Sequence, residues 1–287
     1  MIKSNYNTLV KTHHIEEMSH FFEYFNEIKY GNLNYDAVWK WSGILDSLYK
    51  VYEGSPKFDT CVDVGGGLSP IHLILSNYGK VINVDDCSHT DGKFAGWFPI
   101  KKDGVFYEES DGFEYVKENI EYKNCDFLKW IKDVPDNSID IFVDGCSIIH
   151  IEPCSNHSFH DGVSEVARQI KRTLKPGGFF ISTCDVYNPK MKENYPNLLR
   201  HDGVTYPHSL YKIYKDSGLT PLDESDYKVE EFYKDYNNRV SPIKGAPYHK
   251  RLNPEYSTKK DLPVYHAFQQ LQDFPMLIAR FVFTKSI

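Results

Sequence analysis

The chain contains Cys61-Val62-Asp63-Val64-Gly65-Gly66-Gly67-Leu68-Ser69-Pro70, a short apolar run that leads into three consecutive glycines. Glycine has no Cβ, so it lets the backbone turn sharply and approach a ligand closely. Residues 70–78 follow with the apolar spacing of a helix, and a helix N-terminus favours a carboxylate or phosphate group. This strand, loop and helix predict an adenosine-type cofactor site at the end of a first strand.

Strand-like and helix-like segments alternate on both sides of this loop. The expected strands are 60–64, 80–85, 121–125, 139–144, 179–184, one near 227–232 and 277–284, and the expected helices are 70–78, 127–133, 158–174 and 209–217. Apolar strands that alternate with helices predict an α/β fold with a parallel sheet covered on both faces. Right-handed crossovers make such a sheet doubly wound, with its ligand crevice at the carboxyl ends of the strands.

Segments outside this alternation predict additions to the core. Apolar residues recur at helical spacing over 8–52, so we expect an N-terminal helical cap over 1–56. The remaining residues, 57–287, form the expected cofactor-binding domain. Irregular stretches near 87–112 and 186–265 interrupt the pattern and are interpreted as insertions. The later one carries aromatic and basic residues that suit either a polar substrate or a packed cap.

Composition excludes several classes of protein. Of 287 residues, 41% are apolar, which indicates a globular rather than a disordered chain. A net charge of -7 argues against nucleic acid or anionic membrane as the default partner. Six cysteines without a CxxC pair suggest free thiols in a reducing compartment. No apolar leader or membrane-length run is present, so we expect a cytoplasmic protein.

The glycines alone fit two cofactor classes. The dinucleotide fingerprint requires Gly-x-Gly-x-x-Gly, and aligning Gly65 and Gly67 with it places Pro70 at the third glycine. Proline there opposes the close helix–strand packing that glycine permits, which weakens the NAD interpretation without eliminating it. An NAD-dependent oxidoreductase therefore stays open as an alternative.

The pattern Asp63-x-Gly65-x-Gly67, with the small Ser69 two positions on, resembles motif I of the class I S-adenosylmethionine-dependent methyltransferases. The resemblance covers roughly 58–185 and includes the turn Lys175-Pro176-Gly177-Gly178 before the fifth strand. It implies a seven-stranded, mostly parallel sheet whose last strand is antiparallel. It also implies S-adenosyl-L-methionine as cofactor and S-adenosyl-L-homocysteine as product, with Asp63, Gly65, Gly66, Gly67 and Ser69 around the methionine half.

The same resemblance assigns acidic residues at later strand ends. Asp85, with Asp86 in reserve, would accept hydrogen bonds from the ribose hydroxyls, as a carboxylate does well. Asp126 would accept from the adenine amino group while Phe127 packs on the ring, although Asp126 also fits a helix N-cap. Asp144, at the end of the fourth strand, is the last residue assigned to the cofactor site.

A histidine follows the fourth strand at the place where many small-molecule methyltransferases have one. His150 is our candidate general base, because imidazole titrates in the useful range and a hydroxyl acceptor benefits from a base. His157 and His160 are weaker alternatives. Their spacing from Asp144 matches no standard ligand set, so no metal is expected.

The resulting hypothesis is a methyltransferase for a small polar molecule, acting on oxygen rather than nitrogen. A sugar or nucleotide-sugar for polysaccharide biosynthesis, or a phosphorylated metabolite, is the expected acceptor, with neither nucleic acid nor membrane as partner. A non-catalytic, methyltransferase-like partner subunit is the other alternative, and the set Gly65, Gly67, Asp85 and Asp126 argues against it. The sequence does not predict the oligomeric state.

Overall fold

A computed structural model describes most of the expected strands and helices. The described residues are 6–9, 35–67, 69, 71–86, 100–102, 105–107, 116–150, 159–187, 206–225, 227 and 276–287. All structural statements below concern these residues.

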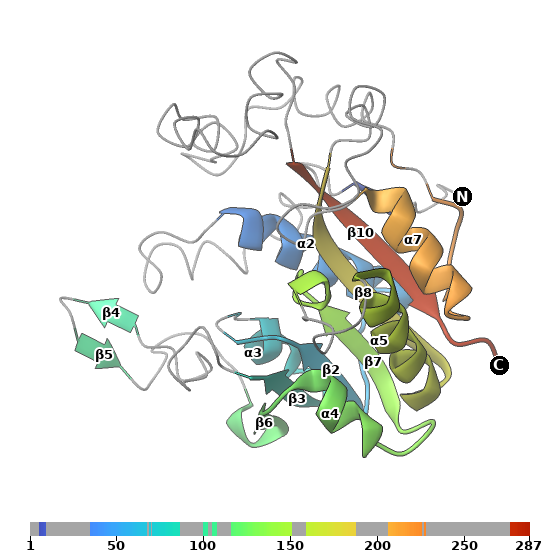
Figure 1. The fold of residues 1–287 in the computed structure, drawn as a ribbon. Helices are drawn as coiled ribbons and strands as arrows, with labels where there is room; N and C mark the ends of the chain where they lie inside the picture. The colour runs from blue at the N-terminus through green and yellow to red at the C-terminus, as the bar shows by residue number, and fades with distance from the viewer. Residues whose placement is uncertain are drawn as a thin grey trace, which may run out of the picture.

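One twisted sheet runs through the protein in the order β1-β10-β8-β7-β2-β3-β6, and β9 also pairs with β10 (Figure 1). Its strands are β1 (Thr8–Leu9), β10 (Met276–Thr284), β8 (Leu174–Tyr187), β7 (Ile139–Asp144), β2 (Thr60–Val64), β3 (Lys80–Asp85), β6 (Ile120–Asn124) and β9 (Thr220–Pro221). The strands β8, β7, β2, β3 and β6 are parallel, whereas β10 is antiparallel to β8. The predicted doubly wound sheet with an antiparallel last strand is confirmed.

Helices cover both faces of the sheet, which explains why its central strands are rich in buried apolar residues. On one face lie α4 (Phe127–Lys132), α5 (Phe159–Thr173) and α7 (Pro207–Asp216), and on the other α2 (Tyr35–Val51) and α3 (Ile71–Leu75) (Figure 1). Two short 3₁₀ helices, η3 (Lys117–Asn119) and η4 (Ile148–His150), lie in connections. No described helix has the length and apolar character needed to cross a membrane.

One expectation about secondary structure was wrong, because Thr8 and Leu9 form a strand paired with β10 rather than the start of a helix. The strand expected near 227–232 falls almost entirely outside the described residues; of these, only Tyr227 is described, and it is not in a strand. The short strand β9 at Thr220–Pro221, which pairs with β10, was not expected. Both strands have two residues, too few to show an alternating pattern.

The two additions to the core are described only in part. From the expected cap, α2 packs on β8 and β10, so this helix is joined to the sheet. The boundary at residue 56 stays a prediction. Within the first insertion, β4 (Ile100–Lys102) and β5 (Val105–Tyr107) form a separate antiparallel pair. Cys61, Cys125, Cys146 and Cys184 are free thiols, as expected.

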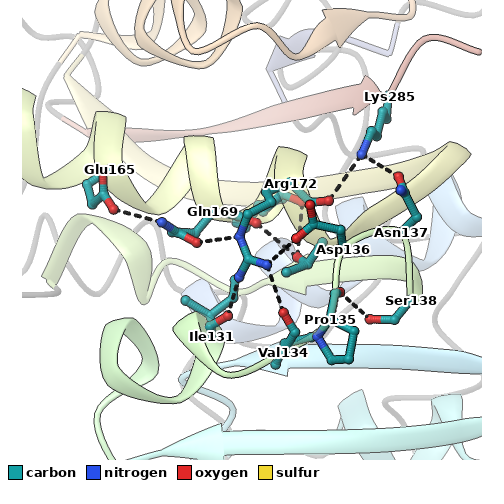
Figure 2. A network of polar contacts seen from close by, with 12 residues as sticks. Ile131, Val134, Pro135, Asp136, Asn137, Ser138, Glu165, Gln169, Arg172 and Lys285 are labelled. Carbon is teal, nitrogen blue, oxygen red and sulfur yellow. Dashed lines mark hydrogen bonds and ion pairs between the residues drawn. The ribbon is translucent and has the colours of Figure 1, made fainter.

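A polar network organises the edge of the sheet where β7 begins (Figure 2). The Arg172 guanidinium donates to the carbonyl oxygens of Ile131 at 2.7 Å and Val134 at 2.8 Å, and to Asp136 Oδ1 at 2.5 Å. Lys285 Nζ reaches Asn137 Oδ1 at 2.7 Å in the turn before β7. The network ties the end of α4 and this turn to α5, at the edge opposite the glycine loop.

Candidate functional site

The carboxyl ends of the parallel strands meet at one edge of the sheet. Val64, the last residue of β2, is paired with both Val84 and Asp144. Asp85 in β3 is likewise paired with Asn124 in β6. This register brings the glycine loop and the polar residues at the strand ends together, at the place where an open α/β sheet binds its ligand.

The glycine loop turns in a conformation that side chains disfavour. Gly65 and Gly67 have φ angles of 59° and 31°, and Gly65 N donates to Val84 O at 2.7 Å. A Cβ on Gly65 would lie 2.3 Å from Ser147 Cβ, and Ser147 Oγ donates to Gly65 O at 2.8 Å. The loop is therefore packed directly against the turn that follows β7.

Two carboxylates lie against the same loop. A Cβ on Gly66 would lie 2.3 Å from Asp63 Oδ2, and one on Gly67 would lie 2.8 Å from Asp85 Oδ2. Only glycine leaves room for these contacts, so the loop backbone and the two acids form one compact cradle. Asp63 is buried, whereas Asp85 is partly exposed and Asp86 is exposed at the end of β3.

Ser69 closes the loop and begins the next helix. Its N–H donates to Gly66 O at 2.6 Å, and its Oγ accepts from Ile71 N at 3.1 Å. Ser69 thus caps α3 as well as lying in the predicted cofactor loop. Leu68 and Pro70 lie outside the described residues.

Asp126 and Phe127 lie at the start of α4, directly after β6. Asp126 Oδ1 accepts from Lys129 N at 2.8 Å, so the N-cap interpretation is confirmed. Phe127 is only 5% exposed and packs edge-on against Phe142 in β7. The contacts predicted between these two residues and an adenine ring stay predictions, and the N-cap geometry is compatible with them.

Asp144 is fully buried and surrounded by donors. Its Oδ1 accepts from Ser147 N at 2.7 Å and Ile148 N at 3.1 Å, and its Oδ2 accepts from Ser182 Oγ at 2.7 Å. Burial raises the pKa of Asp144, and these hydrogen bonds oppose the rise. Its predicted role in the cofactor site is untested, but its contacts show that it fixes the turn after β7.

The candidate base lies at the end of that turn. His150 is the last residue of η4, so the chain places it just beyond the carboxyl end of β7, as expected. Among the alternatives, His160 is exposed at the start of α5, with its Nδ1 3.8 Å from Asp161 Oδ1. His157 lies outside the described residues.

Sequence reasoning missed a buried polar group under the glycine loop. His72, in α3, lies with its Nδ1 3.1 Å from Asn83 Nδ2 and 3.6 Å from Asp63 Oδ2, and with its Nε2 3.2 Å from Tyr122 Oη. His72 and Asn83 are both fully buried. The available signal was a histidine and an asparagine inside otherwise apolar elements. Polar side chains are buried in such elements only when they have hydrogen-bond partners.

Sequence reasoning also missed an ion pair beside the turn after β7. Lys40 Nζ in α2 contacts Asp185 Oδ2 in β8 at 2.8 Å, and Cys146 Sγ lies 3.6 Å from the same oxygen. Burial lowers the pKa of Lys40, whereas Cys146 and Asp185 together raise it by more. The pKa of Lys40 therefore lies above its ordinary value. The partners are more than a hundred residues apart in sequence, and no local pattern could have paired them.

Three solved structures share this fold at low sequence identity. The (4+2)-cyclase SpnF matches with a TM-score of 0.51 and 14% identity over 98% of both chains. A putative sarcosine dimethylglycine methyltransferase from Galdieria sulphuraria has a TM-score of 0.50 and 14% identity over 94% of this chain and 98% of its own. Phosphoethanolamine N-methyltransferase 2 of Haemonchus contortus, in complex with phosphomonomethylethanolamine and S-adenosylhomocysteine, has a TM-score of 0.50 and 15% identity.

The match to the Haemonchus contortus enzyme covers 95% of this chain but only 58% of that protein, so the chain spans little more than half of its length. No protein-family model and no curated protein sequence matches this chain. The fold is that of the class I S-adenosylmethionine-dependent methyltransferases, as the glycine motif predicts.

Proposed function

We propose that the protein is an S-adenosyl-L-methionine-dependent methyltransferase that acts on a small polar molecule. The observation that carries the proposal is the cradle in which Gly66 and Gly67 lie against the carboxylates of Asp63 and Asp85 at the carboxyl edge of the sheet. Fold alone is insufficient, because a fold hosts unrelated activities and one similar structure is named as a cyclase.

The residues of the cradle fit an adenosyl cofactor. Gly65, Gly66 and Gly67 offer close backbone approach, and Asp85 offers a partly exposed carboxylate for two ribose hydroxyls. Asp126 and Phe127 lie one strand further along the same edge, where the adenine would extend. When bound, S-adenosyl-L-methionine supplies the activated methyl group, and the protein must align the acceptor with it and exclude water.

The turn after β7 is where the acceptor would meet the cofactor. Asp144 and Ser147 hold this turn against the glycine loop, and the turn leads to His150. In the proposed reaction His150 would accept the proton of an acceptor hydroxyl as that oxygen takes the methyl group, and the carbon–sulfur bond would break to release S-adenosyl-L-homocysteine. The Lys40–Asp185 pair lies beside the same turn and adds fixed charges to its surroundings.

For the acceptor we propose a sugar, a nucleotide-sugar or a phosphorylated metabolite, methylated on oxygen in the cytoplasm. The net charge of -7 supports a small molecule rather than nucleic acid. The Haemonchus contortus protein was solved with a phosphorylated small molecule, so this fold can accommodate one. Residues 1–50, 87–112 and 186–265 would provide the acceptor-binding surfaces.

The topology disfavours the dinucleotide alternative. In the usual dinucleotide-binding sheet the order is 3-2-1-4-5-6 and mostly parallel. Here the long antiparallel β10 lies next to β8, between the fifth parallel strand and the edge strands. The non-catalytic alternative is disfavoured because the glycine cradle and both of its carboxylates are present.

Calorimetric titration with S-adenosyl-L-methionine, S-adenosyl-L-homocysteine and NAD tests the proposal. We expect both adenosyl compounds to bind and NAD to give no measurable heat. Binding of NAD alone would support the oxidoreductase. If an adenosyl compound binds but a panel of sugars, nucleotide-sugars and phosphorylated metabolites yields no methylated product by mass spectrometry, the proposed acceptor class is wrong.

A further inference from the structure

Four buried or partly buried polar side chains form a row beneath the glycine loop. They come from four elements of the cofactor-binding half of the protein: Asp63 from β2, His72 from α3, Asn83 from β3 and Tyr122 from β6. His72 occupies the centre, with Asn83 Nδ2 at 3.1 Å from its Nδ1 and Tyr122 Oη at 3.2 Å from its Nε2. The row ends at Asp63, which contacts the loop itself.

Two oxygen atoms in this row have no hydrogen-bond donor within the part of the chain that the structure describes. They are Asp63 Oδ2 and Asn83 Oδ1, and both are buried. Both also lie close to one point, since a Cβ on Gly66 would be 2.3 Å from the first and 2.7 Å from the second. Two buried acceptors near one point without a donor are costly, so we expect a hydrogen-bond donor to reach them.

A half-turn of the Asn83 amide supplies the missing donor. Amide oxygen and nitrogen exchange places in this rotation, and the hydrogen-bond network decides between the two orientations. After the turn, Asn83 Nδ2 donates to Asp63 Oδ2, and Asn83 Oδ1 accepts from Nδ1–H of His72. The other ring nitrogen, Nε2, would then accept from the Tyr122 hydroxyl, and the turn would give a hydrogen-bond partner to each of the two oxygens that lack one.

We propose that Tyr122, His72 and Asn83 are positioning residues that hold Asp63 as an ionised carboxylate under Gly66, and thereby set the affinity for S-adenosyl-L-methionine without touching it. The inference rests on the proposed function. All donors in the row point toward Asp63, so the row stabilises its negative charge. S-adenosyl-L-methionine carries one positive charge more than S-adenosyl-L-homocysteine, and that charge interacts favourably with an ionised Asp63 through a low-dielectric interior.

Other charged groups near Asp63 explain why it needs this support. Burial raises the pKa of Asp63, and the neighbouring Asp144 and Asp85 raise it further, whereas His72 lowers it. A carboxyl group in these surroundings is easily protonated. When it takes up a proton, the attraction for the sulfonium is lost, so the affinity for S-adenosyl-L-methionine falls as the pH falls.

The first experiment determines the direction of the hydrogen bonds in the row, in the absence of cofactor. Long-range proton–nitrogen NMR spectra report which ring nitrogen of a histidine carries the proton, and a His72→Gln variant identifies the His72 signals by their absence. We expect neutral His72 to be protonated on Nδ1. Protonation on Nε2 would overturn the proposed direction.

The second experiment measures cofactor affinity against pH for wild type, Asn83→Leu and Tyr122→Phe. We expect Asn83→Leu to lower the affinity for S-adenosyl-L-methionine about tenfold at neutral pH and the affinity for S-adenosyl-L-homocysteine clearly less. As the pH is lowered, the loss of affinity for S-adenosyl-L-methionine should start at a higher pH than in wild type. Tyr122→Phe should shift the profile in the same direction by less. It removes one hydroxyl and keeps the ring, so it serves as the milder variant if Asn83→Leu fails to fold.

Tyr52→Phe is the matched control, because the Tyr52 ring packs on Phe179 in the amino-terminal half of β8 and should leave both affinities unchanged. Unchanged pH profiles and an unchanged ratio of the two affinities in both test variants would overturn the inference while the proposed function stands. If wild type binds neither adenosyl compound, both the proposed function and this inference fail.

Discussion

Ser182 Oγ donates a hydrogen bond of 2.7 Å to Asp144 Oδ2 across the neighbouring parallel strands β8 and β7. The other oxygen of Asp144 accepts from the backbone N–H groups of Ser147 and Ile148. One buried carboxylate therefore joins β7 and β8 to the turn that leads to His150. The arrangement makes Asp144 the anchor of this turn.

The first prediction concerns the pH dependence of stability. Burial raises the pKa of Asp144 against the opposing hydrogen bonds. A carboxyl group with a higher pKa in the folded than in the unfolded chain binds its proton more tightly when folded, so its contribution to the free energy of unfolding falls as the pH rises between the two values. We predict that Asp144→Asn removes this slope from about pH 4 upward, measured by urea denaturation.

Asp144→Ala is the companion variant. It leaves the N–H groups of Ser147 and Ile148 and the Ser182 hydroxyl without their acceptor, so we expect a loss of about 2–4 kcal/mol at neutral pH. Parallel pH profiles for wild type and Asp144→Asn would contradict the raised pKa.

The central strands could be predicted because their environment is simple. Residues 60–64 and 139–144 are mostly apolar and, apart from Thr60 and Asp140, buried, and the helices between strands have the expected periodicity. The glycine loop could also be placed, since three glycines after such a strand require a tight turn. The resemblance to the class I methyltransferases singled out Asp85 and Asp126, and the parallel strands bring both to one edge of the sheet, whereas their contacts with a cofactor stay predictions.

Contacts between distant segments could not be predicted. Thr8 and Leu9 show no strand pattern alone, and they pair with β10 because that edge of the sheet offers them backbone partners. His72 sits in an apolar helix segment and was passed over, although its burial requires partners from two neighbouring strands. The pairs Lys40–Asp185 and Asp46–Arg280 depend on how α2 docks on the sheet.

The second prediction separates the two acids after β3. If Asp85 binds the ribose, Asp85→Ala should lower the affinity for both adenosyl compounds about 10- to 100-fold, because hydrogen bonds to a charged group contribute about 1.5–3 kcal/mol. Asp86→Ala, one residue further and more exposed, should have a much smaller effect in the same titration. The reverse ranking would make Asp86 the ribose acid.

The third prediction concerns the space around Gly66. A methyl group there would lie 2.3 Å from Asp63 Oδ2 and 2.7 Å from Asn83 Oδ1, both in buried side chains that cannot move freely. We expect Gly66→Ala to cost about 1–3 kcal/mol of stability through overpacking and to lower cofactor affinity. Gly145→Ala is the control for stability, since its new methyl group would only touch Trp41 at 3.7 Å. Equal stability losses in the two variants would argue against a tight cradle.

The fourth prediction uses the network at the other edge of the sheet, shown in Figure 2. Arg172→Leu leaves the carbonyl oxygens of Ile131 and Val134 without their donor, and we expect a loss of about 1–3 kcal/mol. Most of this should come from the carbonyls, since Asp136 is 64% exposed and its ion pair is screened by water. Cofactor affinity, measured below the lowered melting temperature, should not change. Asp136→Ala should have a smaller effect on stability.

The last prediction concerns the ion pair between Asp46 in α2 and Arg280 in β10, whose side chains are 3% and 1% exposed. Burial raises the pKa of Asp46, but the charges of Arg280 and Lys50 outweigh it, so the pKa is lower than usual. A lowered pKa means that the carboxylate stabilises the fold above its unfolded pKa, and that this stability is lost as the pH falls through the folded pKa. Asp46→Asn should therefore destabilise the protein more at neutral than at acidic pH in urea denaturation.

Breaking a buried pair by removing one charge costs about 3–5 kcal/mol, because the other charge stays buried without compensation. Replacing both residues, in Asp46→Leu with Arg280→Met, should therefore cost less than Asp46→Leu alone. A double variant less stable than the single one would contradict this. It would mean that Arg280 stabilises the fold mainly through its 3.0 Å hydrogen bond from Nε to Tyr6 O, which holds Tyr6, two residues before β1, against β10.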